Sequence, residues 1–187
     1  LVFSTDVAII KNVNADAIIA VYPFTPQPSI TQAIISVSEV PVFVGVGGGM
    51  TNGDRSVRLA EFSEHQGASG VVVNAPISNE TIAKMKAVVD IPVVTTIVSG
   101  DMDIAGRLAA GADILNVSGA SRTPEIVTKI RAEFPTVPII ATGGPREEDI
   151  LRTIEAGANA ITYTPPTTGQ LFADIMISHR KNFSHQD

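Results

Sequence analysis

The chain has 187 residues, of which 44% are hydrophobic, and it carries no cysteine, 13 Lys and Arg residues and a formal net charge of −6. This length suits one domain over residues 1–187 with a sizeable core, and the lack of cysteine excludes disulfides, thiolate nucleophiles and cysteine-ligated zinc. Scattered positive charges, and apolar runs shorter than the roughly 20 residues of a membrane span, argue against nucleic-acid and membrane partners. The lack of cysteine fits a reducing compartment, so we expect a cytoplasmic protein.

Short apolar strands alternate with helices along the whole chain. We predict strands at Leu1–Phe3, Ala17–Tyr22, Val42–Val46, Val71–Asn74, Val93–Val98, Ile114–Val117, Pro138–Ala141 and Asn159–Tyr163. We predict helices at Asp6–Val13, Ser29–Val37, Asp54–Gln66, Asn79–Val89, Asp103–Ala110, Pro124–Phe134, Glu147–Ala156 and Gln170–Arg180. The last helix is expected to turn four residues inward, Leu171, Phe172, Ile175 and Met176. Asp6 and Lys11 interrupt the first apolar stretch, so we expect no signal peptide.

Alternate strands are preceded by the same kind of dipeptide, and the strands between them by proline. The dipeptides are Asn14-Ala15, Gly67-Ala68, Gly111-Ala112 and Gly157-Ala158, and the prolines are Pro41, Pro92 and Pro138. A unit of two strands and two helices therefore recurs four times. We predict an α/β fold with parallel strands, a compact (βα)8 TIM barrel, with an open doubly wound sheet as the alternative because it shows the same alternation.

Two glycine clusters follow predicted strands. They are Gly47, Gly48 and Gly49 after the third strand, and Thr142, Gly143 and Gly144 after the seventh. Glycine lets the backbone approach a ligand, and the helix that starts after each cluster offers free amides and a dipole that attract an anion. The alternative role of these glycines is packing.

The stretches PVFVGVGGGMTNGDRSVRLAEFSEHQGASGVVV and PIIATGGPREEDILRTIEAGANAITY resemble the paired glycine loops of phosphate-binding (βα)8 barrel enzymes. That group includes thiamine phosphate synthase, ketodeoxyphosphogluconate-type aldolases, N-acylmannosamine phosphate epimerase and the histidine-biosynthesis barrels. The resemblance covers about a third of the chain and implies a small phosphorylated or otherwise anionic metabolite at the loops after the third, seventh and eighth strands. The chain departs from the pattern at Pro165 and Pro166, which lack amide hydrogens, and leaves Thr167, Thr168 and Gly169 as donors.

Few ionisable residues fall at strand ends. The resemblance to the histidine-pathway isomerase implies catalytic aspartates after the first and fifth strands, where Asp6 and Asp101, or Asp103, lie. Facing carboxylates can share acid and base work, although Asp6 and Asp101 also suit helix N-caps. A Schiff-base aldolase would need a strand-end lysine, but every lysine falls within or at the end of a predicted helix: Lys11, Lys84, Lys86, Lys129 and Lys181.

Neutral polar residues are the other candidates for the site. We predict that the substrate is lined by Asn74, Asn116, Ser118 and Tyr163, with Thr95 and Thr96 as further candidates. A polar residue in an apolar strand needs a partner, which is either another core group or a ligand. Arg122 and Arg146, at helix starts, could reach a phosphate or form surface salt bridges. We predict no metal, because Asp101 and Asp103 lack a third ligand. We also predict no organic cofactor.

We therefore predict an enzyme of the isomerase, lyase or hydrolase type with its site at the barrel mouth. The alternative is a non-catalytic metabolite sensor resembling the glycerol-3-phosphate-responsive antiterminator barrels, because the strand ends are poor in acids and bases. Homo-oligomerisation is left open. A Gly143→Asp substitution is expected to remove phosphate-dependent stabilisation while the fold survives.

Overall fold

The computed structural model describes residues 5–144 and 146–183, with side chains described from residue 7 to residue 181. These residues form seven strands: β1 (Ile18–Ala20), β2 (Val42–Gly47), β3 (Gly70–Val73), β4 (Val93–Ile97), β5 (Ile114–Val117), β6 (Ile139–Thr142) and β7 (Ala160–Thr162). The α-helices are α1 (Thr5–Asn12), α2 (Pro28–Val37), α3 (Asp54–His65), α4 (Asn79–Lys86), α5 (Ile104–Ala109), α6 (Thr123–Glu133), α7 (Glu147–Glu155) and α8 (Thr168–Phe183). A short 3-10 turn, η1 (Ala120–Arg122), precedes α6.

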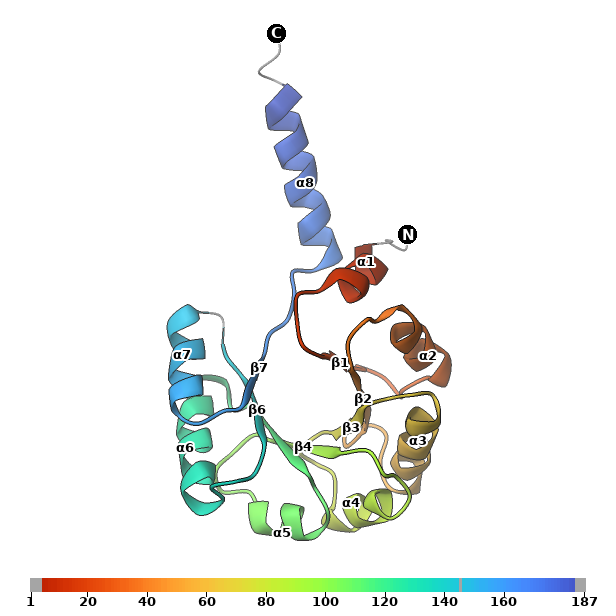
Figure 1. The fold of residues 1–187 in the computed structure, drawn as a ribbon, viewed down its shortest axis with the longest axis vertical. Coiled ribbons are helices and arrows are strands. Elements are labelled where there is room, and N and C mark those ends of the chain that lie inside the picture. Colours follow the sequence, from red (N-terminus) through yellow and green to blue (C-terminus); the bar gives the residue numbers. More distant parts are fainter. Residues whose placement is uncertain (1–4, 145, 184–187) are drawn as a thin grey trace.

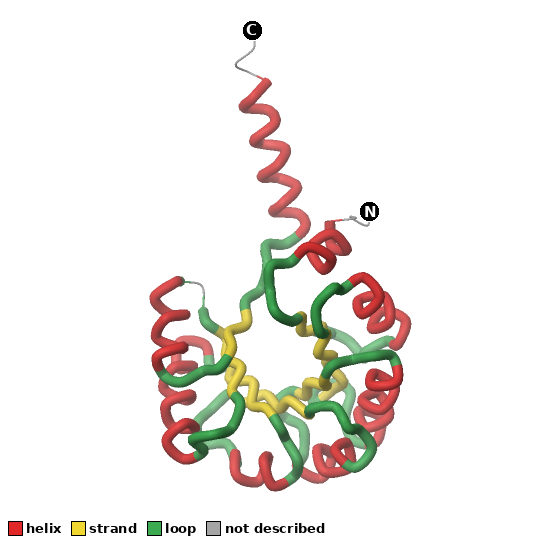
Figure 2. Tube along the Cα trace, in the orientation of Figure 1, coloured by secondary structure: helices red, strands yellow, loops and turns green. Residues whose placement is uncertain are grey.

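The strands form one parallel sheet in the order β1-β2-β3-β4-β5-β6-β7. The sheet curls around a central axis, and helices α2 to α7 lie on its outer side (Figure 1; Figure 2). This is the predicted α/β barrel of the TIM type. Within the described residues β1 and β7 are the two edges of the sheet. The predicted first strand, Leu1–Phe3, lies outside the described residues, so the predicted second strand is β1 and the predicted eighth is β7.

The core fills the space between the sheet and the outer helices. In β2 the side chains of Val42, Val44 and Val46 are buried against the helices, and the residues between them face the barrel axis. Strands β3 and β4 are buried throughout, as expected for parallel strands covered on both faces. Alternate strand residues therefore divide into a helix-facing set that stabilises the fold and an axis-facing set that can meet a ligand.

Three helices end in the same way, at the Gly-Ala dipeptides noted in the sequence. Gly67, Gly111 and Gly157 have φ values of 95°, 105° and 105°, a left-handed conformation that favours glycine. The alanine after each glycine donates its amide hydrogen back to a carbonyl of the preceding helix, as Ala112 does to Arg107 at 3.1 Å. This arrangement stops the helix and turns the chain toward the next strand. The recurrent dipeptide is thus a structural repeat.

Helix α8 departs from the prediction. It projects away from the barrel beyond the open side of the sheet (Figure 1). Phe172 and Ile175, which were expected to face inward, are 50% and 51% exposed. The physical reason lies in residues 163–167, an irregular segment that contains Pro165 and Pro166 and leads the chain away from the sheet. At its base α8 borders an apolar hollow with α1, lined by Leu171 and Ile175 on one side and Ile9 on the other.

None of the helices in the described ranges is long and apolar enough to cross a bilayer.

Candidate functional site

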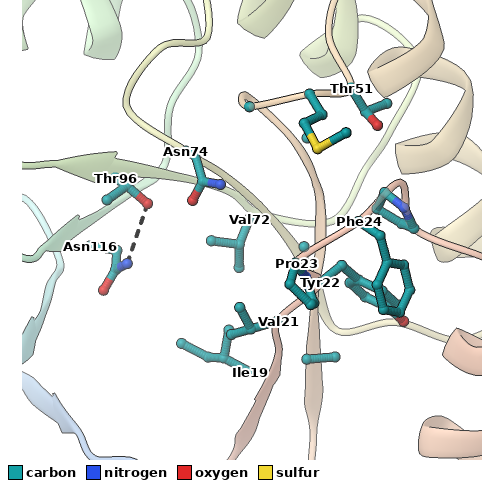
Figure 3. Close-up of a pocket in the computed structure, with 16 residues that line it drawn as sticks. Ile19, Val21, Tyr22, Pro23, Phe24, Thr51, Val72, Asn74, Thr96 and Asn116 are labelled. Carbon is teal, nitrogen blue, oxygen red and sulfur yellow. Dashed lines mark hydrogen bonds between the residues drawn. The ribbon is translucent and has the colours of Figure 1, made fainter.

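A cavity of about 130 Å³ opens at the carboxyl end of the strands and reaches into the barrel. Its first wall is apolar or aromatic and comes from β1, β2 and the segments that follow them: Ile19, Val21, Tyr22, Phe24 and Met50. Its second wall is polar and comes from β3, β4 and β5: Asn74, Thr96 and Asn116 (Figure 3). The carboxyl end of a parallel barrel is where such folds carry their sites. The position and the two unlike walls make this cavity the candidate site.

The polar wall is a row of neutral side chains on neighbouring strands. Thr96 and Asn116 are register partners in β4 and β5, and Asn74 directly follows β3. The Asn116 Nδ2 donates to the Thr96 Oγ1 at 3.4 Å, while the Asn116 Oδ1 is buried and has no hydrogen-bond partner. A buried acceptor without a partner is costly in a folded protein. Asn116 therefore has unused hydrogen-bonding capacity beside the cavity.

A second row of hydroxyls continues around the barrel. The Thr142 Oγ1 donates to the Ser118 Oγ at 3.4 Å and lies 3.4 Å from the Thr162 Oγ1. Both distances are at the long end for hydroxyl pairs, which prefer about 2.7–2.8 Å. Ser118, predicted to contact the substrate, therefore belongs to this row and is absent from the cavity lining.

The first glycine loop, Gly47 to Gly49, borders the cavity. Gly47 and Gly48 have structural roles. A Cβ on Gly47 would lie 2.0 Å from the Ser56 Oγ, and the Gly48 amide donates to the Thr51 carbonyl at 2.9 Å. At Gly49 the space is open, because the nearest atom to an added Cβ is the Asn74 Nδ2 at 3.9 Å. Gly49 is therefore the member of the cluster that can admit a ligand to its backbone.

The second glycine loop is built differently and does not line the cavity. The Gly143 amide donates to the Thr162 carbonyl at 3.4 Å, and the side chain of Asp149 lies beside Gly144. Helix α7 also begins with Glu147, Glu148 and Asp149, whose charges repel an anion from this helix start. Phosphate binding here stays a prediction, and these contacts weigh against it.

The expectation that the fold survives Gly143→Asp stays a prediction, and the packing around Gly143 weighs against it. A Cβ at this position would lie 2.7 Å from the Ile150 Cγ1 and 2.7 Å from the Ile161 Cγ2. Gly143 is therefore a close-packing position, and any side chain there must displace its neighbours.

The residues after β7 form the start of α8. The Thr167 amide donates to the Gln170 Oε1 at 2.9 Å, and the Gln170 amide donates to the Thr167 Oγ1 at 3.3 Å. This reciprocal pair is a capping box. Thr168 is the first residue of α8, and Gly169 has open space around it. None of the three lines the cavity, so their predicted contact with a phosphate stays untested.

Of the predicted aspartates, Asp101 and Asp103 are absent from the cavity lining. The side chain of Asp101 is 90% exposed and pairs with the Lys129 Nζ at 3.3 Å. Asp103 is the N-cap of α5, since its Oδ1 accepts from the Gly106 amide at 2.9 Å. Asp6 lies in α1, and its side chain is outside the described part of the chain. The capping role suggested for Asp101 thus belongs to Asp103, and the catalytic roles stay predictions.

Other candidate residues are placed as follows. Tyr163 is 57% exposed after β7 and does not line the cavity, and Thr95 faces the helices. Arg146 forms a salt bridge with Asp149 at 2.9 Å, which is the second of the two roles considered for it. The hydrogen bond from Arg146 holds the pKa of Asp149 below its usual value. Among the described side chains, no three His, Asp or Glu residues gather to hold a metal ion.

The aromatic side of the cavity was not among the predicted site residues. Tyr22 and Phe24 meet edge to face, with ring centroids 6.1 Å apart, in the segment after β1. The Tyr22 hydroxyl lies 2.6 Å from the Thr31 hydroxyl, and burial raises the pKa of Tyr22 although this hydrogen bond lowers it in part. Two aromatic residues set among prolines directly after a strand were the available signal.

No protein family model matches this sequence. No curated protein matches it either.

Solved structures with the same fold are numerous. One is the 4-hydroxy-tetrahydrodipicolinate synthase of Methylacidiphilum fumariolicum SolV, with a TM-score of 0.67 and 14% identity over 86% of this chain and 61% of that one. A second is the aldolase QR15, with a TM-score of 0.67 and 16% identity over 84% and 81% of the two chains. A third is 2,3-dimethylmalate lyase, with a TM-score of 0.61 and 17% identity over 82% and 64%.

At these identities the comparison establishes the fold. The chain has the TIM-barrel fold. It spans about three fifths of the length of the dihydrodipicolinate synthases that it resembles. The neighbours do not single out the phosphate-binding group to which the glycine loops were compared.

Proposed function

We propose that the protein is an enzyme that binds a small anionic metabolite at the mouth of its barrel and acts on it by lyase-type chemistry. The observation that carries the proposal is the shared cavity of Gly49, Asn74, Thr96 and Asn116 at the carboxyl end of the strands. The aldolase and the lyase named among the structural neighbours support lyase-type chemistry. A phosphorylated metabolite is the first class to test, because the glycine loop suits a phosphate.

In this proposal the anionic group lies at the rim, against the backbone of Gly49. No charged side chain lines the described cavity, so main-chain amides would supply the attraction. Deeper in the cavity, the amide groups of Asn74 and Asn116 would donate to an oxygen on which negative charge develops during bond cleavage.

The reaction proposed here does not use a Schiff base. None of the five lysines lines the cavity, and each belongs to a helix: Lys11, Lys84, Lys86, Lys129 and Lys181. A Schiff-base mechanism requires an amine within reach of the substrate carbonyl. Asp6 stays the proposed acid or base, because Asp101 is paired with Lys129 at the surface.

A non-catalytic sensor is the second candidate. It is favoured by the described lining of the cavity, in which Tyr22 is the one residue with a titratable proton. An enzyme would convert its ligand, whereas a sensor would release it unchanged. Incubating the protein with each ligand that binds and following it by NMR therefore separates the two functions.

The binding site is tested by thermal shift with a panel of sugar phosphates and small carboxylates. Gly49→Asp adds a negative charge where the structure leaves space, and we expect it to abolish the shift without lowering the melting temperature of the free protein. Gly169→Asp is the matched variant, because it also enters open space but lies at the start of α8. A ligand shift that survives Gly49→Asp and is lost in Gly169→Asp would move the site to the loop after β7.

A further inference from the structure

The cavity lacks charge on every side that the structure describes. Its 16 lining residues include no Asp, Glu, Lys, Arg or His. Burying a charged group without a countercharge is strongly unfavourable, because the group loses its hydration. A ligand with an anionic group can therefore place that group at the open rim, and the part that enters the barrel must be uncharged.

The polar wall selects among uncharged groups. The Asn116 amide has an oxygen without a hydrogen-bond partner, and its nitrogen makes one long contact, with the Thr96 Oγ1 at 3.4 Å. Exchange of the oxygen and nitrogen positions would leave the nitrogen unpaired instead. The first orientation needs a further donor and the second a further acceptor, and a hydroxyl group can serve as either.

The opposite wall restricts the shape of the ligand. Ile19 and Val21 present apolar surface, and Phe24 adds an aromatic ring (Figure 3). Met50 also lines the cavity. A carbon chain or ring that carries hydroxyls on one side matches this pair of walls, because its apolar side is buried while its hydroxyls meet the amides.

We infer that the end of the metabolite that enters the barrel is uncharged and hydroxylated, and that Asn116 and Thr96 recognise it. This inference rests on the proposed function and specifies its substrate class. The anionic group stays outside, at Gly49. Asn116 and Thr96 are then specificity-determining residues. A ligand with the same anionic group but no hydroxyl lacks the group that these two side chains would bind.

Three probes with one phosphate test the inference by isothermal titration calorimetry. Glycerol 3-phosphate has an uncharged hydroxylated end, propyl phosphate lacks the hydroxyls, and 3-phosphoglycerate carries a carboxylate there. We expect glycerol 3-phosphate to bind about fivefold or more tightly than either of the others, since one unpaired buried polar group has at least that effect.

The protein offers a matched pair of variants. Thr96→Val removes the hydroxyl that faces the cavity, and we expect it to weaken glycerol 3-phosphate binding to the level of propyl phosphate. Thr95→Val changes the preceding residue of the same strand, whose hydroxyl is buried on the helix side without a partner. We expect it to leave all three affinities unchanged. Asn116→Leu should act as Thr96→Val does, with circular dichroism confirming that each variant is folded.

The outcomes separate the inference from the function on which it rests. Equal affinities for the three probes, or discrimination that survives both Thr96→Val and Asn116→Leu, would overturn the inference while the rim site stands. If neither the three probes nor inorganic phosphate bound, both the inference and the proposed binding of a phosphorylated metabolite would be overturned.

Discussion

At the scale of single residues, Arg107 connects two neighbouring units of the barrel. It lies on α5, and its guanidinium donates to the Ile77 carbonyl and, at 2.8 Å, to the Ala75 carbonyl. Both acceptors belong to the segment that presents Asn74 to the cavity. Burial lowers the pKa of Arg107, and the nearby charge of Asp103 offsets this effect in part. The residue is therefore a structural support of the polar wall.

Replacing Arg107 tests this support. Arg107→Met keeps the apolar stem but leaves two carbonyls without a charged donor, and we expect a loss of about 2–4 kcal/mol in the free energy of unfolding. Urea unfolding followed by circular dichroism measures it. Arg58→Met, on the exposed side of α3, is the control and should change the free energy by less than about 0.5 kcal/mol. Equal effects of the two substitutions would contradict the assigned role.

Gly143 offers a second test at this scale. Gly143→Ala introduces a methyl group 2.7 Å from Ile150 and Ile161, and overpacking of this kind costs about 1–3 kcal/mol. Gly169→Ala enters open space in α8 and should be neutral or slightly stabilising. Thermal unfolding of both variants compares them, and a Gly143→Ala protein as stable as the parent would show that the contact is relaxed in solution.

At the scale of elements, the start of α7 is organised by its own charges. Arg146 donates to both carboxylate oxygens of Asp149, at 2.9 and 3.1 Å, one turn into the helix. Glu147 and Glu148 add negative charge at the same end, which complements the helix dipole. This helix start is therefore already supplied with anions, which explains why its glycine loop is a poor candidate for a phosphate.

The pH dependence of this pair is predictable in sign. The Arg146 guanidinium holds the pKa of Asp149 below its ordinary value of 3.8, so the pair stabilises the folded protein above that pH and the contribution is lost as the pH falls through the folded pKa. We expect Arg146→Ala to raise the pKa of Asp149 toward 3.8 in an NMR titration. Arg152→Ala removes a lesser influence and is the comparison. An unshifted Asp149 in the Arg146→Ala protein would mean that the pair does not persist in solution.

At the scale of the whole molecule, α8 contributes little to the barrel. Phe172 and Ile175 are half exposed, and the helix lies beyond the open side of the sheet (Figure 2). A chain that ends at Pro166 should therefore keep the barrel, with a melting temperature lowered by no more than about 4 °C.

A core substitution calibrates this prediction. Ile130→Ala, at a fully buried position of α6, should cost about 2–5 kcal/mol. Differential scanning calorimetry of both proteins compares the two losses. If removal of α8 abolished cooperative unfolding, the helix would have to pack on the barrel in solution.

The architecture could be predicted because its signals are local. Ile114–Val117 was located without error, and the other described strands were located within two residues at each end. Apolar runs specify buried parallel strands, and the glycine of each Gly-Ala dipeptide is needed for the left-handed turn that ends a helix. The site was predicted less well. Asn74 and Asn116 line the cavity, whereas Tyr163 does not, because its side chain falls on the solvent side after β7.

The sequence by itself determined the order of strands and helices, the parallel sheet and the scarcity of ionisable groups at the strand ends, since these follow from composition and from spacing along the chain. Only the tertiary structure decided which glycine loop borders the cavity, that Asp103 and not Asp101 caps its helix, and that α8 leaves the barrel. Those features depend on which side chains from distant segments come into contact, as Asn74 approaches Gly49. The spacing of residues along the sequence does not specify such contacts.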